Sequence, residues 1–173
     1  MLFESERLSF RKPASKDFER FWAMLNDPSA KEFTGGVTRL GYEERLALFM
    51  EECGIDFSLR GAEFAVVKKG SSLYLGYCGF RESEALGAPE FLFGYCRDSW
   101  GKGFATEAAR AVLKHLFRAY PHPAYLATVD PRNTASKRVM EKAGFTRTHL
   151  CPNMKIEPAE IYQLKERDFS QRY

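Results

Sequence analysis

A strand-like run over residues 91–97 passes into a long amphipathic pattern over residues 102–120 through Gly101-Lys102-Gly103, the glycine turn. This strand–turn–helix unit requires a sheet with a helix packed on it. Glycine lacks a side chain, so a ligand can approach the backbone closely at both positions. The first turn of a helix also presents unpaired N–H groups and the positive end of the helix dipole. The unit predicts a phosphate-binding site, with an ordinary tight turn as the simpler interpretation.

Three phosphate-binding patterns compete for the glycine turn. A Walker-type loop needs glycine where Cys96 stands and Ser or Thr where Gly103 stands, so that pattern fails. A Rossmann fingerprint is matched at Gly101 and Gly103 but meets Thr106 at its third glycine position. Asp130 stands roughly where a ribose-binding carboxylate belongs. The dinucleotide interpretation is weakened because one strand–helix–strand unit is visible, past the middle of the chain.

The third pattern is a pyrophosphate-binding motif of coenzyme A enzymes. Residues 100–108 resemble the Gln/Arg-x-x-Gly-x-Gly/Ala motif of GCN5-related N-acetyltransferases (the GNAT family), with Trp100 replacing the usual polar first residue. Residues 133–145 are similar to the family's Asn-x-x-Ser segment that ends in Gly-Phe. Residues 6–11 and Asp27-Pro28 resemble the branch that acetylates the N-termini of ribosomal proteins (RimJ/RimL-like). The resemblance spans nearly the whole chain.

The resemblance implies a mixed α/β (α+β) GNAT fold. Its central, mostly antiparallel sheet of about seven strands is flanked by about four helices, with splayed strands in the middle. Gly87-Ala88-Pro89 is expected to break the chain before the third long strand. We expect residues 1–173 to form a single N-acetyltransferase domain. The hydrophobic patterns predict strands over residues 2–11, 64–69, 73–80, 91–97, 125–129, 146–150 and 161–164, and helices over 13–26, 42–54, 102–120 and 133–143.

By the same resemblance the chain binds acetyl-coenzyme A. The pantetheine arm is expected to lie along a splayed strand, whose unpaired N–H and C=O groups suit an amide-bearing arm. For the outer phosphate Lys137 and Arg138 are alternatives, and a solvated helix face explains both equally well. The cofactor-binding residues implied are Tyr95, Cys96, Arg97, Gly101, Lys102, Gly103, Phe104, Ala105, Thr106, Asn133, Ser136 and Arg138. A single Cys without a base partner does not suggest an acyl-enzyme, so Cys96 is interpreted as packing.

The implied reaction is direct attack of a neutral amine on the thioester carbonyl, with a backbone N–H of residues 93–97 donating to the developing oxyanion. Many relatives place a tyrosine where Met140 stands, and Ser136, one turn earlier, is therefore the candidate proton donor to the leaving thiolate. Helix surface or helix capping is the alternative for Ser136. Glu90 is the better candidate to accept the amine proton and Glu82 the weaker one. Either carboxylate is also typical of a solvated strand end.

Composition and charge limit the kinds of partner that the chain can bind. The chain is 45% hydrophobic and 14% aromatic, which supports a substantial core. A net charge of +3 without a basic stripe argues against a nucleic-acid partner but suits a small anionic ligand. The sequence holds no membrane-length apolar run and opens without a signal-peptide pattern, so we expect no membrane partner and a cytoplasmic location. Its four scattered cysteines predict reduced, packed thiols and no metal site.

The identity of the acceptor amine is open at this point. A protein N-terminal α-amino group leads, because an amine of pKa ~8 is about one-tenth neutral at pH 7 and asks little of a base. Polyamines and aminoglycosides are alternatives. A catalytically silent coenzyme A-binding protein is a further one, since Met140 cannot give a proton, and a dinucleotide-dependent oxidoreductase is a distant one. Both a monomer and a homodimer are compatible with the sequence.

Overall fold

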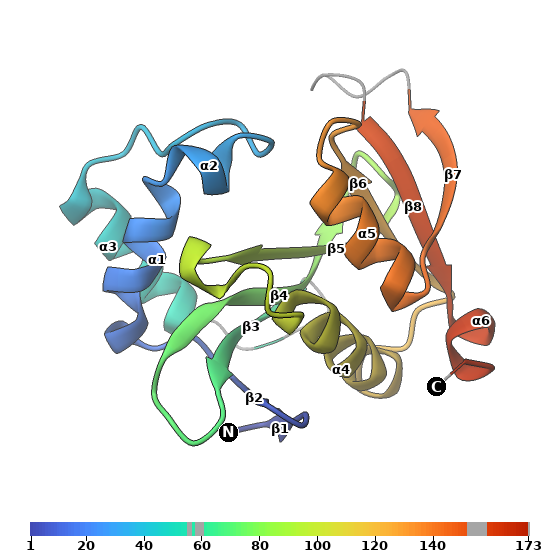
Figure 1. The fold of residues 1–173 in the computed structure, drawn as a ribbon, viewed down its shortest axis with the longest axis horizontal. Helices are drawn as coiled ribbons and strands as arrows, with labels where there is room; N and C mark the ends of the chain where they lie inside the picture. Colours follow the sequence, from blue (N-terminus) through green and yellow to red (C-terminus); the bar gives the residue numbers. More distant parts are fainter. Residues whose placement is uncertain (55–56, 58–60, 152–158, 173) are drawn as a thin grey trace.

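The computed structural model describes residues 1–54, 57, 61–151 and 159–172, and its strands form one eight-stranded sheet (Figure 1). In spatial order the strands are β1 (Phe3–Glu4), β2 (Leu8–Arg11), β3 (Gly61–Lys68), β4 (Tyr74–Ser83), β5 (Ala88–Tyr95), β6 (Ala124–Val129), β8 (Ala159–Lys165) and β7 (Thr146–Cys151). The helices are η1 (Ser15–Asp17), α1 (Phe18–Leu25), α2 (Pro28–Lys31), α3 (Tyr42–Gly54), η2 (Arg97–Ser99), α4 (Phe104–Ala119), α5 (Thr134–Ala143) and α6 (Glu166–Ser170). No helix in these ranges has the length and apolar content that a bilayer span requires.

Strand pairing divides the sheet into two halves. Six of its seven strand pairs are antiparallel, and β4 and β5 pair at every position from Gly76–Tyr95 to Ser83–Ala88. The exception is the parallel pair β5–β6, which is joined at the single position Glu90–Leu126. Beyond this bridge the two strands run apart, as Figure 1 shows at the centre of the molecule. The predicted splayed strands are thus β5 and β6.

Alternation along the strands gives the sheet two apolar faces. On one face α4 buries Ala108, Val112 and Leu116, which recur at helical spacing, against strand residues such as Phe64 and Tyr125. On the other face the α1 and α3 side chains, including those of Phe18, Phe21 and Phe49, pack on Ala65, Val67 and Tyr74 of β3 and β4. The layers therefore leave the end of β5 between two helical covers.

The fold class is confirmed, and the structure corrects four details of the predicted elements. The single strand expected over residues 2–11 is a hairpin, because the Ser5 amide donates to the Leu8 carbonyl and closes a turn. Pro89 does not break the chain: it lies inside β5, before the β6 pairing begins, where its missing N–H disrupts no second ladder. The apolar period of residues 42–54 places Met50 on the inner face of α3, but its side chain is 46% exposed. The sequence analysis also missed the short helices α2 and α6.

We predict that Gly79→Ala destabilises the protein by about 3 kcal/mol, because the new Cβ lies 1.9 Å from the Ala62 carbonyl oxygen and the paired strands have to shift. Gly41→Ala is the matched control, since its Cβ meets nothing within 4 Å and its φ is not positive. It is expected to change the free energy of unfolding by at most ~0.5 kcal/mol. Urea unfolding of both variants measures the difference, and equal destabilisation would contradict the register of β3 and β4.

Candidate functional site

The glycine turn has the geometry of an anion-binding site. Gly101 and Gly103 adopt left-handed φ values of +71° and +78°, which side chains rarely permit, and nothing lies within 4 Å of a Cβ built on Gly101. Gly103 is also the N-cap of the 16-residue helix α4, and no side-chain hydrogen bond caps that end. The amides of the first turn therefore remain available to a ligand.

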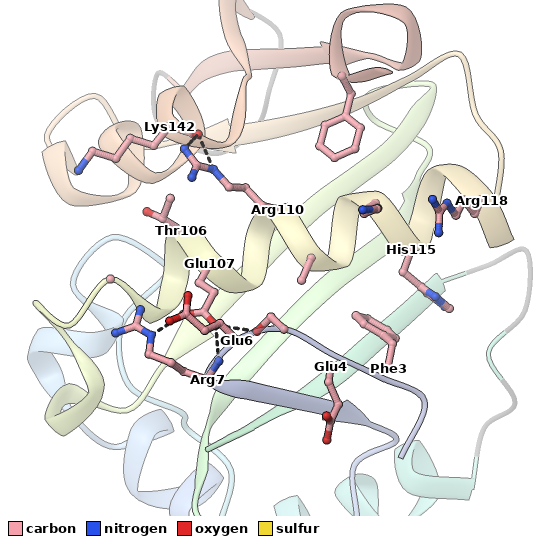
Figure 2. A pocket seen from close by; sticks show the side chains of 15 residues that line it. Phe3, Glu4, Glu6, Arg7, Thr106, Glu107, Arg110, His115, Arg118 and Lys142 are labelled. Atoms are coloured by element: carbon pink, nitrogen blue, oxygen red, sulfur yellow. Dashed lines mark hydrogen bonds and ion pairs between the residues drawn. The ribbon is translucent and has the colours of Figure 1, made fainter. Parts of the chain in front are cut away.

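The two helices beside the splayed strands are joined to each other. Because β5 and β6 are parallel, their carboxyl ends lie at the same end of the sheet, and α4 and α5 both begin there. The Arg110 guanidinium of α4 donates to the Lys142 carbonyl of α5 at 2.7 Å, and Thr106 points to the same side of α4 (Figure 2). The structure thus brings the glycine turn and the start of α5 to the same end of the sheet, where β5 and β6 are no longer paired with each other; we call this unpaired stretch the opening.

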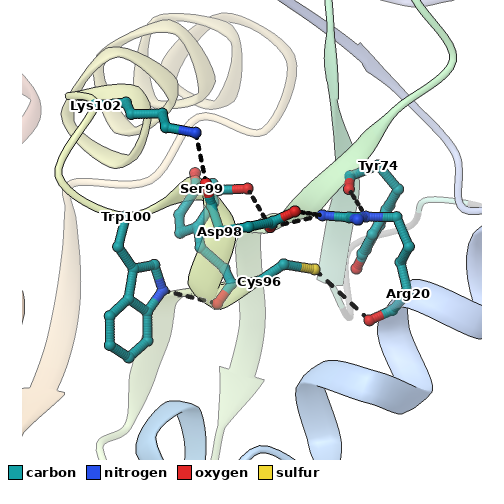
Figure 3. A network of polar contacts seen from close by, with 8 residues as sticks. Arg20, Tyr74, Cys96, Asp98, Ser99, Trp100 and Lys102 are labelled. Carbon is teal, nitrogen blue, oxygen red and sulfur yellow. Dashed lines mark hydrogen bonds and ion pairs between the residues drawn. The ribbon is translucent and has the colours of Figure 1, made fainter.

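Trp100 anchors the glycine turn to the strand before it. Its indole Nε1 donates to the Tyr95 carbonyl at 2.9 Å, although the side chain as a whole is 46% exposed (Figure 3). A polar residue at this position of the family motif could offer its side chain to a ligand. Here the indole N–H donates to the protein backbone instead. Trp100 therefore fixes the turn, and the backbone amides of the glycine turn remain to bind a ligand.

A polar network fixes the other side of the turn (Figure 3). Arg20 of α1 binds the Asp98 carboxylate at 2.7 Å and the Tyr74 carbonyl at 2.6 Å. The hydrogen bond from Arg20 lowers the pKa of Asp98 below its usual range. Lys102, one of the expected cofactor-binding residues, donates from Nζ to the Asp98 carbonyl at 2.6 Å. The sequence analysis missed Arg20, because its partner is 78 residues away and no local pattern links them.

Some backbone groups at the carboxyl end of β5 already make hydrogen bonds within the protein. The Tyr95 carbonyl accepts the Trp100 indole, and the Cys96 amide donates to the Leu75 carbonyl at 2.9 Å. The side chains of Tyr95 and Cys96 are buried, whereas that of Arg97 is exposed. Burial raises the pKa of the Cys96 thiol, which keeps the sulfur protonated and agrees with a packing role.

The start of α5 places the second predicted motif at the opening. Asn133 is the N-cap, and its Oδ1 accepts the Ser136 amide at 2.9 Å, so the capping group is Asn133 and not the Ser136 hydroxyl. Ser136 is half-buried and lies one turn before the buried Met140, on the same side of the helix. Lys137 donates to a backbone carbonyl of the preceding loop at 2.6 Å, and Arg138 is exposed.

Glu90 lies at the closed end of the gap. It is 8% exposed, its Oε2 accepts Arg81 Nη2 at 2.9 Å, and its Oε1 accepts the Thr128 hydroxyl of β6. It is therefore not a solvated strand-end residue. Glu82 is exposed, and its nearest recorded partner is His122, with Nε2 3.6 Å from the carboxylate.

The acidic residue of the dinucleotide interpretation is engaged elsewhere. The Asp130 carboxylate accepts the backbone amide and two guanidinium nitrogens of Arg132 at 2.7–3.0 Å. The Arg132 side-chain and amide hydrogen bonds lower the pKa of Asp130 to about 2. A ribose hydroxyl would have to share the carboxylate with these Arg132 hydrogen bonds. Among residues 1–54, 57, 61–151 and 159–172 no cluster of three His, Cys, Asp or Glu is arranged to hold a metal.

Comparison with known proteins agrees with this geometry. A family model described as an acetyltransferase (GNAT) domain matches residues 7–146. YkkB of Bacillus subtilis (strain 168), an uncharacterised protein, is 31% identical over 173 residues, covering 93% of this chain and 94% of YkkB. A GNAT-family acetyltransferase structure from Bacillus anthracis has a TM-score of 0.79 at 27% identity and covers 96% of this chain and 99% of its own. Spermidine N-acetyltransferase from Vibrio cholerae, solved with CoA and spermine, has the same TM-score at 16% identity over 96% and 99% of the two chains.

We predict that Gly103→Glu weakens coenzyme A binding by at least ~30-fold, because a carboxylate beside a phosphate costs about 2 kcal/mol or more. Gly70→Glu is the matched control: Gly70 has a similar φ of +75°, open surroundings and a place in the β3–β4 turn. It adds the same charge and the same backbone strain away from the opening, so its affinity should be unchanged. Calorimetric titration of both variants measures this, and wild-type affinity in Gly103→Glu would rule out the glycine turn as the phosphate site.

Proposed function

The chain belongs to the GNAT acetyltransferase family, and from this premise we propose that it acetylates a protein N-terminal α-amino group, using acetyl-coenzyme A. We assign it to the RimJ/RimL-like branch, acting as one domain of residues 1–173 in the cytoplasm. The observation that carries the proposal is the opening between β5 and β6 beside an uncapped helix with a glycine turn. An acyl carrier with an amide-bearing arm and a pyrophosphate needs these two features side by side.

The residues around this opening fit coenzyme A. Left-handed glycines leave the backbone of the glycine turn bare, and the first-turn amides of α4 point toward the position proposed for the pyrophosphate. The amides of residues 101–106 would hold these phosphates, and the unpaired edge of β5 near Tyr95 would pair with the arm. We further propose that Asn133, Ser136 and Arg138 contact the carrier from α5. Bound acetyl-coenzyme A supplies the activated acetyl group.

The proposed reaction forms a C–N and an S–H bond and breaks a C–S and an N–H bond. The neutral amine nitrogen bonds to the thioester carbonyl carbon and loses a proton, while the C–S bond breaks and the leaving sulfur takes a proton from a donor that solvent reprotonates. A backbone N–H of β5 stabilises negative charge on the carbonyl oxygen. We assign the proton donation to Ser136, since the Asn133 side chain caps α5 and leaves the Ser136 hydroxyl uncommitted to capping.

Glu90 is the proposed acceptor of the amine proton. Both its oxygens already accept hydrogen bonds from the protein, and in our proposal the amine proton reaches Glu90 through one of these partners. The Thr128 hydroxyl offers such a route: it donates to Glu90 Oε1 and comes from β6, across the gap. In this arrangement the amine gives its proton to the hydroxyl oxygen while the hydroxyl proton passes to the carboxylate.

The second candidate acceptor is a small polyamine. It is favoured by the overall likeness to a spermidine N-acetyltransferase, although a likeness at 16% identity concerns the fold alone. The α-amino group remains the first choice because at pH 7 about one-tenth of such groups are neutral, against about one in a few thousand for a lysine-like amine. A relayed base with two occupied oxygens suits the more easily deprotonated amine.

We predict that a peptide carrying both a free N-terminus and an internal lysine is acetylated at the α-amine at least ~100-fold faster at pH 7. Thiol release and mass spectrometry of the product identify the modified nitrogen, and the same peptide with a blocked N-terminus is the control. The rate should rise about tenfold per pH unit up to pH ~8 and then level off, as the α-amine loses its proton. Faster turnover of spermidine than of every peptide would favour the polyamine alternative.

We predict that Ser136→Ala lowers kcat at least ~10-fold and raises the KM for acetyl-coenzyme A by a smaller factor, because the hydroxyl contacts the carrier but acts chiefly on the chemical step. Thr134→Ala is the control: Thr134 lies in the same first turn of α5 but is exposed. Steady-state kinetics of both variants distinguish the two positions. Unchanged kcat in Ser136→Ala would assign the proton to another donor or to water.

A further inference from the structure

Glu107, in the first turn of α4, is held by the N-terminal hairpin (Figure 2). The Ser5 hydroxyl donates to its Oε1 at 2.7 Å, and the Arg7 amide donates to the same oxygen at 2.8 Å. Arg7 Nε donates to Oε2 at 2.7 Å. Three donors thus converge on one carboxylate from a segment about 100 residues earlier in the chain.

Arg7 also reaches the glycine turn itself. Its Nη1 donates to the Lys102 carbonyl at 3.1 Å, and its guanidinium carbon lies 4.8 Å from the centre of the Phe104 ring. Its Nη2 is 3.5 Å from the position of a Cβ built on Gly103. One guanidinium therefore contacts Lys102 and Phe104 and reaches to the edge of Gly103, between them. Arg7, Gly103 and Thr106 also line one surface groove of about 880 Å³ along α4.

The charge of Glu107 makes this contact relevant to phosphate binding. Burial alone would raise the pKa of Glu107, but the hydrogen bonds from the Arg7 amide, the Ser5 hydroxyl and the Arg7 guanidinium outweigh burial and lower it. Glu107 is therefore an anion one turn from the proposed pyrophosphate position. Left uncompensated it would repel the phosphates, and Arg7 supplies the opposing charge at the contact.

We propose that Arg7 is a positioning residue for the pyrophosphate of coenzyme A. Arg7 holds the Lys102 carbonyl, which orients the Gly103 amide toward the ligand. It also neutralises Glu107 and places the outer nitrogen of its guanidinium beside Gly103. This inference rests on the proposed function, because it concerns the same donor site. The N-terminal hairpin thereby becomes part of the coenzyme site and not merely an edge of the sheet.

The test compares acetyl-coenzyme A with S-acetylpantetheine, a donor that lacks the pyrophosphate. In Arg7→Met the KM for acetyl-coenzyme A should rise ~10-fold or more, with kcat within about twofold, since a charge-assisted contact to the phosphate region is lost. The kcat/KM for S-acetylpantetheine should stay within about twofold of wild type. A merely structural role would lower activity with both donors, and that result, or an unchanged KM for acetyl-coenzyme A, would overturn the proposal.

Two further variants complete the test. Arg7→Lys keeps the charge but not the forked donors, so its KM for acetyl-coenzyme A should lie between those of wild type and Arg7→Met. If Arg7→Met does not fold, Arg7→Lys replaces it in the comparison of the two donors. Lys69→Met is the matched control: Lys69 holds the same hairpin through Glu4 at 2.8 Å, and none of its recorded contacts is with the glycine turn. Its KM should not change. If the wild type releases no thiol from acetyl-coenzyme A, the proposed function is wrong. If the wild type turns over normally and Arg7→Met has the same KM for acetyl-coenzyme A, only the inference about Arg7 is wrong.

Discussion

The single parallel bridge between Glu90 and Leu126 is the contact on which the rest of the architecture depends. On either side of it the neighbouring strands pair antiparallel, and beyond it β5 and β6 each keep an unpaired edge. The Glu90 carboxylate binds Arg81 of β4 and Thr128 of β6, so three strands are tied together where the gap begins. An open edge inside a sheet leaves backbone groups without partners, which a ligand with amides of its own can satisfy.

The sequence predicted the elements whose signals are long and local. In α4 and α5 apolar residues recur at helical spacing, and α5 ends at Ala143 as predicted, with Gly144 in a left-handed conformation. The four- and five-residue helices α2 and α6 are too short to show such a period. The interruption of the first strand was hidden because the turn at Ser5 uses backbone groups, which leave no trace in the hydrophobic pattern.

The same distinction separates the parts of the candidate site. The glycine turn could be recognised from sequence, since left-handed backbone and missing side chains are properties of the glycines themselves. Its supports could not be recognised, because Arg20 binds Asp98 across 78 residues and Arg7 binds Glu107 across 100. Arginine next to a hairpin or on a helix face is ordinary surface composition, and only the fold shows which carboxylate it meets.

Donor and acceptor are specified by different kinds of chemistry. In the proposed site the donor is held chiefly by backbone groups, which the fold itself positions, and the same fold occurs in a spermidine N-acetyltransferase of only 16% sequence identity. The acceptor meets side chains, and fold alone does not determine these. What the structure adds is the surroundings of Glu90, which is 8% exposed and accepts hydrogen bonds at both oxygens. With Glu90 as the proposed proton acceptor, an amine that is already partly neutral at physiological pH needs the least from the base, and this favours an α-amino group over a polyamine in the proposal.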